Sequence, residues 1–301
     1  MVVEADAPNK LWGSDAPGAT VSVAAFGVTY NSTADSGGSW SVLIAAQPKS
    51  TVPTTITISS TSGGSATLSD VLVGITVVCS GQSNMELNVG STFNFVTETA
   101  DADALGATLR IFQVAMLDSY SSVNTPQTNL TASIPWARAS TANVAGMSAL
   151  CYYLGAELVM KHPDTPIGLL ASSWGGTAIQ PWCSPAALGR CKGAAPAPTH
   201  EELAASADPG LAVVGRMALL SRSGEGAFPT NGSCLYNSII SPLMLNPKRM
   251  LAWYQCVCKQ LPRRARALSH TLMPPMCATH RPRFYRAGAS RTRGIPWGTS
   301  A

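Results

Sequence analysis

The sequence predicts an α/β fold with a parallel sheet, preceded by a small all-β domain. Short runs rich in Val, Thr, Ile and Ser, broken by Gly and Pro, fill residues 1–75. Short apolar runs with little alternation follow, as expected of strands that are buried on both faces. A helical stretch lies between two of these runs. The order strand, helix, strand favours parallel strands joined by right-handed crossovers.

Length and composition are those of a folded protein. The chain has 301 residues, of which 46% are hydrophobic and 12% are charged. This length suits one large domain, or a medium one with an appendage, and the apolar content excludes a wholly disordered chain. No run approaches the ~18 consecutive apolar residues of a membrane span. No signal peptide is visible in this chain, because its start has no basic region followed by an apolar one.

Residues 1–75 are expected to form a small β-sandwich. Alternation at residues 21–23 and 55–58 is typical of strands with one buried face. Gly-containing turns at residues 35–38 and 62–65 separate the strands. The strands are predicted at residues 19–28, 40–45, 54–60 and 66–73.

Residues 76–255 are expected to form the α/β domain. A helix is predicted over residues 145–161, where apolar residues recur at spacings of three and four. Residues 184–230, rich in Ala, Gly and Pro, are interpreted as a long surface excursion. Strands are predicted at residues 75–79, 109–114, 167–171 and 251–254.

Residues 256–301 differ in charge from the rest of the chain. They hold Lys259 and eight arginines without Asp or Glu, hence +9, which leaves −5 for residues 1–255 because the whole chain carries +4. An Arg- and Pro-rich stretch of one sign is typical of a non-globular tail. Three interpretations stay open: binding of nucleic acid or an acidic surface through the arginines, a solvated tail without a role, or an out-of-frame translation.

The segment over residues 77–86, which reads VVCSGQSNME, carries a candidate nucleophile. A buried strand ends there, Gly81 permits a tight turn, and Ser83 follows. Ligands of α/β sheets bind outside the carboxyl ends of strands, and backbone N–H groups near a helix start can stabilise an oxyanion. From these residues alone, Ser83 as an ordinary helix cap is an open alternative.

The block CSGQSNM at residues 79–85 resembles the nucleophile block of the sialate O-acetylesterases, members of the SGNH-type serine esterases. Three further blocks follow in the family's order: PIGLLASSWGGTAIQPW at 166–182, LYNSIISPL at 235–243 and AWYQ at 252–255. The resemblance covers about residues 1–255. It implies the flavodoxin-like parallel sheet of the SGNH hydrolases, truncated at its C-terminal side, after an N-terminal β-domain.

The resemblance also implies roles for individual residues. Ser83 becomes the nucleophile that attacks an acetyl ester. Gly175 and Gly176 line the oxyanion hole, and Gln255 adds a side-chain donor. From the residues alone, a strand-to-helix turn is the preferred interpretation of Gly175 and Gly176.

The implied substrate is an O-acetylated sugar, a sialic acid or a related one, contacted by Trp174 and Asn237. The resemblance implies no cofactor and no metal, and no nucleic-acid partner is expected. The oligomeric state stays open. The family's location is secretory, lysosomal or extracellular, and Met1 aligns inside the family's opening motif, so an upstream leader is an expectation.

The family pattern breaks after Gln255. In the family, Gly-Glu-Ser follows, and later an Asp and a His complete the triad. Here CVCKQ follows, at the place where the charge also changes, which favours the out-of-frame interpretation of the tail. The missing part of the domain is expected to leave an apolar sheet edge open.

No histidine of this chain is assigned as the catalytic base. His162 is predicted at a helix C-terminus and His200 in a solvated loop, and His270 and His280 lie in the tail. A serine hydroxyl without a base is a weak nucleophile. The alternative function is therefore a catalytically inactive truncated pseudoenzyme or a weak sugar-binding protein.

The cysteines predict no metal site. The spacing of Cys256 and Cys258 is not that of a zinc pair. Cys79 and Cys151 lie in apolar contexts and are expected in the core. Residues 183 and 191 form either a disulfide or a pair of thiols.

Overall fold

The computed structural model describes residues 1–190, 205, 229 and 231–255. They belong to one compact unit, Met1–Val257. Most of the predicted surface excursion and the whole Arg-rich tail lie outside the described residues. In the described part of the chain, no helix has the length and apolar character needed to cross a membrane.

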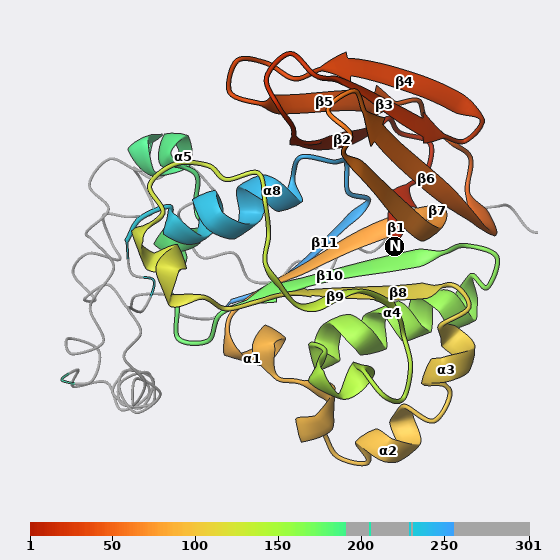
Figure 1. Ribbon diagram of the computed structural model, residues 1–301. Coiled ribbons are helices and arrows are strands. Elements are labelled where there is room, and N and C mark those ends of the chain that lie inside the picture. The colour runs from red at the N-terminus through yellow and green to blue at the C-terminus, as the bar shows by residue number, and fades with distance from the viewer. Residues whose placement is uncertain (191–204, 206–228, 230, 256–301) are drawn as a thin grey trace, which may run out of the picture. The chain divides into compact units, whose positions relative to one another are not determined.

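The N-terminal part consists of strands in two sheets (Figure 1). Its strands are β1 (Val2–Glu4), β2 (Asn9–Ser14), β3 (Thr20–Ala25), β4 (Val28–Thr33), β5 (Ser39–Ile44) and β6 (Ser50–Ser60). β2 and β5 form a separate antiparallel pair, while β4, β3 and β6 follow one another in a larger sheet that continues into β7 (Ser65–Gly81). β1 runs parallel to β7.

The core of this part takes its side chains from both sheets. Val21 and Val23 of β3 are buried while their neighbours are more exposed, which confirms the predicted alternation. Trp40 and Ile44 of β5 belong to the same apolar cluster. The two sheets therefore share one core, and a separate β-sandwich domain stays a prediction.

Two predicted strand boundaries were wrong in this region. The run predicted at residues 19–28 is divided between β3 and β4, because Phe26 and Gly27 both have positive φ and close a two-residue hairpin. The runs predicted at 66–73 and 75–79 form the single 17-residue strand β7. Because β7 pairs with strands of both parts, a domain boundary at residue 75 stays a prediction.

The C-terminal part of β7 lies in a mixed sheet that confirms the predicted α/β fold class. β11 (Met250–Tyr254), β7, β10 (Ile167–Ser173) and β8 (Leu109–Val114) run parallel to one another. β9 (Ala132–Arg138), which the sequence did not predict, pairs antiparallel with β8.

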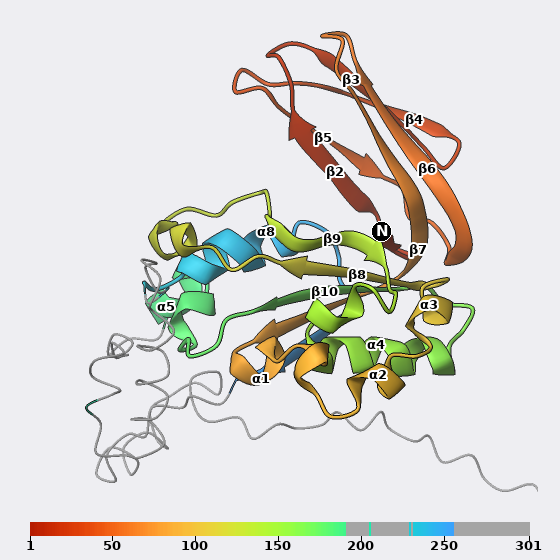
Figure 2. The ribbon, with the colours of Figure 1, turned by 60° about the horizontal axis from the view of Figure 1, so that its bottom comes forward.

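Helices cover both faces of this sheet, as Figure 2 shows for α1 to α4 on one side and α5 and α8 on the other. The long helix α4 (Ala149–Lys161) begins four residues later than predicted, and Ser148 is its N-cap. The shorter turns are α1 (Ser83–Glu86), η1 (Val89–Ser91), α2 (Phe95–Glu98), α3 (Ala102–Leu105), η2 (Asp118–Ser122), η3 (Val144–Gly146), η4 (Gln180–Trp182), α5 (Pro185–Arg190), η5 (Tyr236–Ile240) and α8 (Ser241–Leu243).

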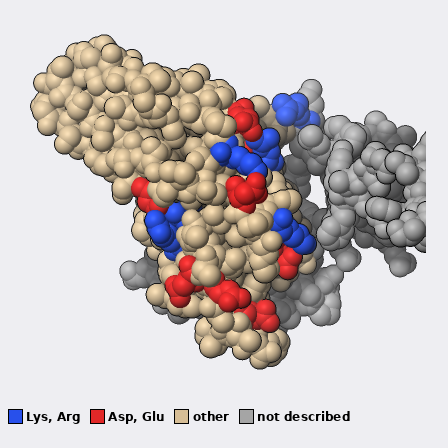
Figure 3. Space-filling model, turned by 90° about the vertical axis from the view of Figure 1, so that its right-hand side faces the viewer, with Lys and Arg blue, Asp and Glu red and all other residues tan. Residues whose placement is uncertain are grey.

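The carboxylate of Asp70 on β7 forms ion pairs with arginines of β8 and β9. Arg110 on β8 is 1% exposed and donates to both carboxylate oxygens of Asp70, at 2.9 and 3.0 Å. Arg138 on β9 donates to the same carboxylate at 2.9 and 3.1 Å. Partial burial would raise the pKa of Asp70, but the hydrogen bonds from the two arginines outweigh it and lower that pKa. On the face drawn in Figure 3, basic and acidic side chains lie together in small groups of mixed sign.

Candidate active site

Three neighbouring strands end at the same edge of the sheet. Ser173 of β10 and Tyr254 of β11 both lie opposite Gly81 of β7. The segments that follow these strands hold the residues predicted to act: Ser83 after β7, residues 174–176 after β10, and Gln255 after β11. This edge is where parallel α/β sheets place their ligands.

Gly81 turns the chain from β7 into α1. Its φ is +141°, and a Cβ built there would lie 2.0 Å from the carbonyl oxygen of Tyr254. Only glycine fits so close to a neighbouring strand at that φ. Gln82 then donates its N–H to the Tyr254 carbonyl at 3.0 Å. The turn leaves Ser83 exposed at the start of α1.

Gly175 lies against Ser83. A Cβ built on Gly175 would be 3.4 Å from the Cβ of Ser83 and 2.7 Å from a carboxylate oxygen of Glu86. The N–H of Gly175 donates to that Glu86 carboxylate. The next residue, Gly176, has φ +76° and completes the turn. One predicted oxyanion donor thus has an internal partner in this structure, and the assignment of the oxyanion hole stays a prediction.

Thr177, which sequence reasoning missed, is the centre of a hydrogen-bond network behind this turn. It is fully buried, and its hydroxyl donates to the Trp174 carbonyl at 2.7 Å and accepts from the indole N–H of Trp182 at 2.9 Å. Its carbonyl accepts from Nε2 of Gln255 at 3.0 Å, and Oε1 of Gln255 accepts from Trp253 at 3.1 Å. Gln255 therefore braces the glycine turn from β11.

The two predicted sugar-contacting residues meet one segment, residues 118–127. The ring of Trp174 packs edge-on against Tyr120, with centroids 6.5 Å apart. Asn237, which is 2% exposed, donates its side-chain amide to the Val123 carbonyl at 3.2 Å, and its Oδ1 has no hydrogen-bond partner in the described structure. Asn237 lies on η5, a π-helical turn, a feature frequent at functional sites.

The described residues place no histidine at this edge. His162 is the C-cap of α4, as predicted, and precedes the first residue of β10, whereas Ser83 follows the last residues of β7. Because β7 and β10 run parallel, His162 lies at the opposite edge of the sheet. Residues 200, 270 and 280 lie outside the described residues.

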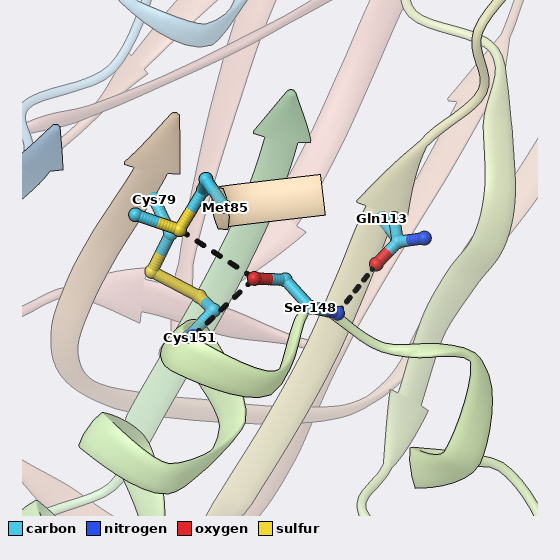
Figure 4. The surroundings of a disulfide bond; sticks show 5 residues. All are labelled: Cys79, Met85, Gln113, Ser148 and Cys151. Carbon is cyan, nitrogen blue, oxygen red and sulfur yellow. Dashed lines mark hydrogen bonds between the residues drawn. A yellow bond between two sulfur atoms is a disulfide. The ribbon is translucent and has the colours of Figure 1, made fainter. Parts of the chain in front are cut away.

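A disulfide between Cys79 and Cys151 joins β7 to α4 (Figure 4). Both cysteines are buried, as expected of core residues, but sequence reasoning missed that they are bonded to each other. Ser148 packs beside them: its hydroxyl lies 3.5 Å from the sulfur of Met85 on α1, and its N–H donates to Gln113 at 2.9 Å. The strand, α1 and α4 are thereby held together immediately below Ser83.

The other described cysteines and acidic groups form no metal centre. Cys183 is a free thiol whose pKa is raised by burial, and residue 191 lies outside the described residues. Over the described ranges, no three His, Cys, Asp or Glu side chains gather in a way that could hold a metal ion.

Known proteins resemble this chain over most of its length. No family model matches it. Sialate O-acetylesterase of Mus musculus is 30% identical over 275 residues, which cover 81% of this chain and 48% of the mouse protein. The Homo sapiens sialate O-acetylesterase is 30% identical over 194 residues, or 62% of this chain and 31% of the human protein.

A solved structure resembles it as well. A carbohydrate acetylesterase from Xanthomonas citri superposes with a TM-score of 0.64 at 28% identity, over 85% of this chain and 48% of that one. The chain thus spans about half the length of the mouse protein and of the Xanthomonas citri enzyme.

Proposed function

We propose that this chain, which belongs to the sialate O-acetylesterase family, carries a serine esterase site for O-acetyl esters of sialic acids or related sugars. The observation that supports this most is the convergence of Ser83, Gly175 and Gln255 at one strand edge. The proposed sugar contacts are Trp174, which directly follows β10, and Asn237, whose buried Oδ1 has no hydrogen-bond partner among the described residues.

The proposed reaction runs through an acetyl-enzyme. The Ser83 hydroxyl attacks the acetyl carbonyl, the bond between that carbon and the sugar oxygen breaks, and the proton given up by Ser83 passes to the sugar oxygen, so that the sugar leaves as an alcohol. Water then attacks the acetyl group on Ser83, which releases acetate and restores the hydroxyl. The backbone N–H groups of Gly175 and Gly176 are the proposed donors to the tetrahedral oxyanion, with the Glu86 carboxylate giving up its bond to Gly175 when the oxyanion forms.

A second candidate function follows from the position of His162. Because His162 lies at the opposite sheet edge, Ser83 has no histidine base among the described residues. Loss of the base typically lowers the rate by ~10⁴-fold. The alternative is therefore an inactive pseudoenzyme that retains weak sugar binding at the same edge.

The test is acetylation of Ser83 itself. The full chain is incubated with 4-nitrophenyl acetate, and the peptide that carries Ser83 is examined by mass spectrometry. We expect an acetyl adduct in the wild type and in a Ser91→Ala control, an exposed serine on η1, and none in Ser83→Ala. A folded wild type that neither carries an acetyl group on Ser83 nor releases 4-nitrophenol faster than Ser83→Ala contradicts the esterase proposal.

Imidazole separates the two candidate functions. If the chain has no base of its own, added imidazole should accelerate acetylation of Ser83 at least about tenfold, a part of the 10²–10⁴-fold effect of a positioned base. An active enzyme with its own base should respond little to imidazole and should hydrolyse O-acetylated sialic acid without it.

The proposed location is secretory, lysosomal or extracellular. The buried Cys79–Cys151 disulfide supports it, because disulfides persist in oxidising compartments and are rare in the cytosol.

A further inference from the structure

A cavity of about 370 Å³ lies on the face of the sheet opposite α4. Its volume is within the range of small-molecule sites. Thr76 of β7 lines it, five residues before Gly81. Leu170 of β10 also lines it and lies opposite Val78, three residues before Gly81, so at about 3.3 Å per strand residue roughly 10 Å separate the cavity from the turn that carries Ser83. The cavity is thus a site of its own.

Hydrogen bonds between distant segments fix the walls of the cavity. Asn246 accepts from the backbone N–H of Lys10 at 2.5 Å and donates to its carbonyl at 3.1 Å. Arg249 donates to the buried carboxylate of Glu4 at 2.8 Å, and that carboxylate accepts from Thr76 at 2.6 and 2.9 Å. A cavity whose walls are held in this way needs little ordering when a ligand binds.

Lys248 supplies a cation that faces this cavity. Its ammonium donates to two backbone carbonyls, of Asn246 at 3.1 Å and Pro247 at 3.4 Å. Among the described residues, no carboxylate lies within salt-bridge distance of the Lys248 ammonium. The carboxylate of Glu4 pairs with Arg249 instead. Burial lowers the pKa of Lys248 to about 8, although the charge of Glu4 opposes this. A bound anion would therefore stabilise the charged lysine.

Aromatic rings supply the rest of the binding surface. Half-buried Trp12 and Trp136 line the cavity together with Phe112, and the rings of Trp136 and Phe112 lie 5.5 Å apart. Aromatic walls with a few placed polar groups are typical of sites for small organic molecules. Flat rings of this kind also suit the C–H face of a sugar.

We propose that this cavity binds a carboxylated sugar, namely a free sialic acid, with its carboxylate on Lys248 and a face of its ring against Trp12 and Trp136. The proposal rests on the proposed function in one respect: a sialic acid is the product that the Ser83 site would release. The ligand is held without reaction, at a site separate from the catalytic edge.

The test is calorimetric titration of the full chain with N-acetylneuraminic acid, and with N-acetylmannosamine as a sugar without a carboxylate. We expect binding to weaken at least tenfold in Lys248→Met and in Trp12→Ala, and to persist in Lys248→Arg. Lys161→Met is the matched control, because Lys161 pairs with Glu157 on the exposed side of α4. The neutral sugar should bind at least tenfold more weakly than the acid.

Three results would overturn the proposal: a folded wild type that binds no acid, Lys248→Met and Trp12→Ala variants that bind like the wild type, or binding lost in Trp174→Ala but kept in Lys248→Met. The last result would place the sugar at the catalytic edge. Thermal unfolding of each variant checks that it folds. Since acetylation of Ser83 is measured separately, failure of this proposal and failure of the esterase proposal remain distinguishable.

Discussion

At the scale of single residues, the backbone of Gly81 decides where Ser83 stands. We expect Gly81→Ala to lower the free energy of unfolding by about 3 kcal/mol or more, because a positive φ costs about 1–3 kcal/mol and a Cβ would also collide with the Tyr254 carbonyl. Gly63→Ala is the control, since Gly63 has φ +93° with nothing within 4 Å, and about 1 kcal/mol is expected there. Urea unfolding measures both values, and equal losses would contradict the collision.

Some site residues could be found from the sequence and others could not. Ser83 and Gly175 lie in blocks whose order along the chain is itself a signal. Thr177 and Glu86 act through partners that are distant in sequence: Gln255 lies 78 residues beyond Thr177, and Gly175 lies 89 beyond Glu86. Such contacts depend on which strands become neighbours. For Thr177, the available signal in the sequence was its place directly after two glycines.

At the scale of elements, Asp70 holds β7, β8 and β9 together. We expect Asp70→Asn to lower the free energy of unfolding by about 2 kcal/mol at pH 7, because it leaves the buried Arg110 without its counter-charge. Asparagine tolerates the positive φ of 54° at this position. Arg138→Gln is the milder control, under about 1 kcal/mol, since Arg138 is 59% exposed.

Asp70 also makes the difference in free energy of unfolding between the wild type and Asp70→Asn depend on pH. Because the pKa of Asp70 is lower in the folded than in the unfolded state, its stabilisation is present above the unfolded value of about 3.9 and is lost as pH falls through the folded one. The gap between wild type and Asp70→Asn should be constant between about pH 5 and 7 and should shrink below about pH 4. A gap that widens in acid would contradict this role.

The disulfide joins β7 to α4 across 72 residues. Loop-closure entropy for a loop of that length corresponds to about 4 kcal/mol, so Cys79→Ala with Cys151→Ala should lower the free energy of unfolding by about that amount. Dithiothreitol should lower the unfolding temperature of the wild type and leave that of the double variant unchanged. Cys183→Ala, which removes a free thiol, controls for the loss of a cysteine alone.

Strands buried on both faces were the easiest elements to predict. β8 has the bounds that its apolar run indicates, and β10 extends the predicted run by two residues. β2 and β9 escaped, because β2 contains Asn, Lys and Gly and β9 contains Pro135 and half-exposed side chains. Such strands are held by hydrogen bonds to a neighbouring strand, and their own residues show little alternation of apolar and polar side chains.

At the scale of the whole molecule, the chain resembles the family over most of its own length but spans only about half the length of a family member. The described residues include Ser83, the proposed nucleophile, and the glycine turn with the hydrogen bonds that hold it, while the resemblance implies that the family's Asp and His would follow the point where Gln255 meets the Arg-rich tail. That the tail is out of frame stays a prediction. The transcript read across codon 255 in three frames decides it: another frame that continues Gly-Glu-Ser would favour the active esterase, and its absence the alternative.

β11 is an outermost strand of the sheet, and its unpaired side bears on whether two molecules associate. In the described structure β11 pairs with β7 on one side only, and Leu251 on it is 58% exposed. An unpaired apolar edge favours pairing with a second chain. We expect the full chain to sediment as larger species at higher concentration, and Leu251→Lys to reduce that association at least severalfold. Met160→Lys is the matched control, because Met160 is 59% exposed on the helix α4 and lies on no strand. Association that both substitutions reduce equally would indicate general hydrophobic contact in place of pairing at β11.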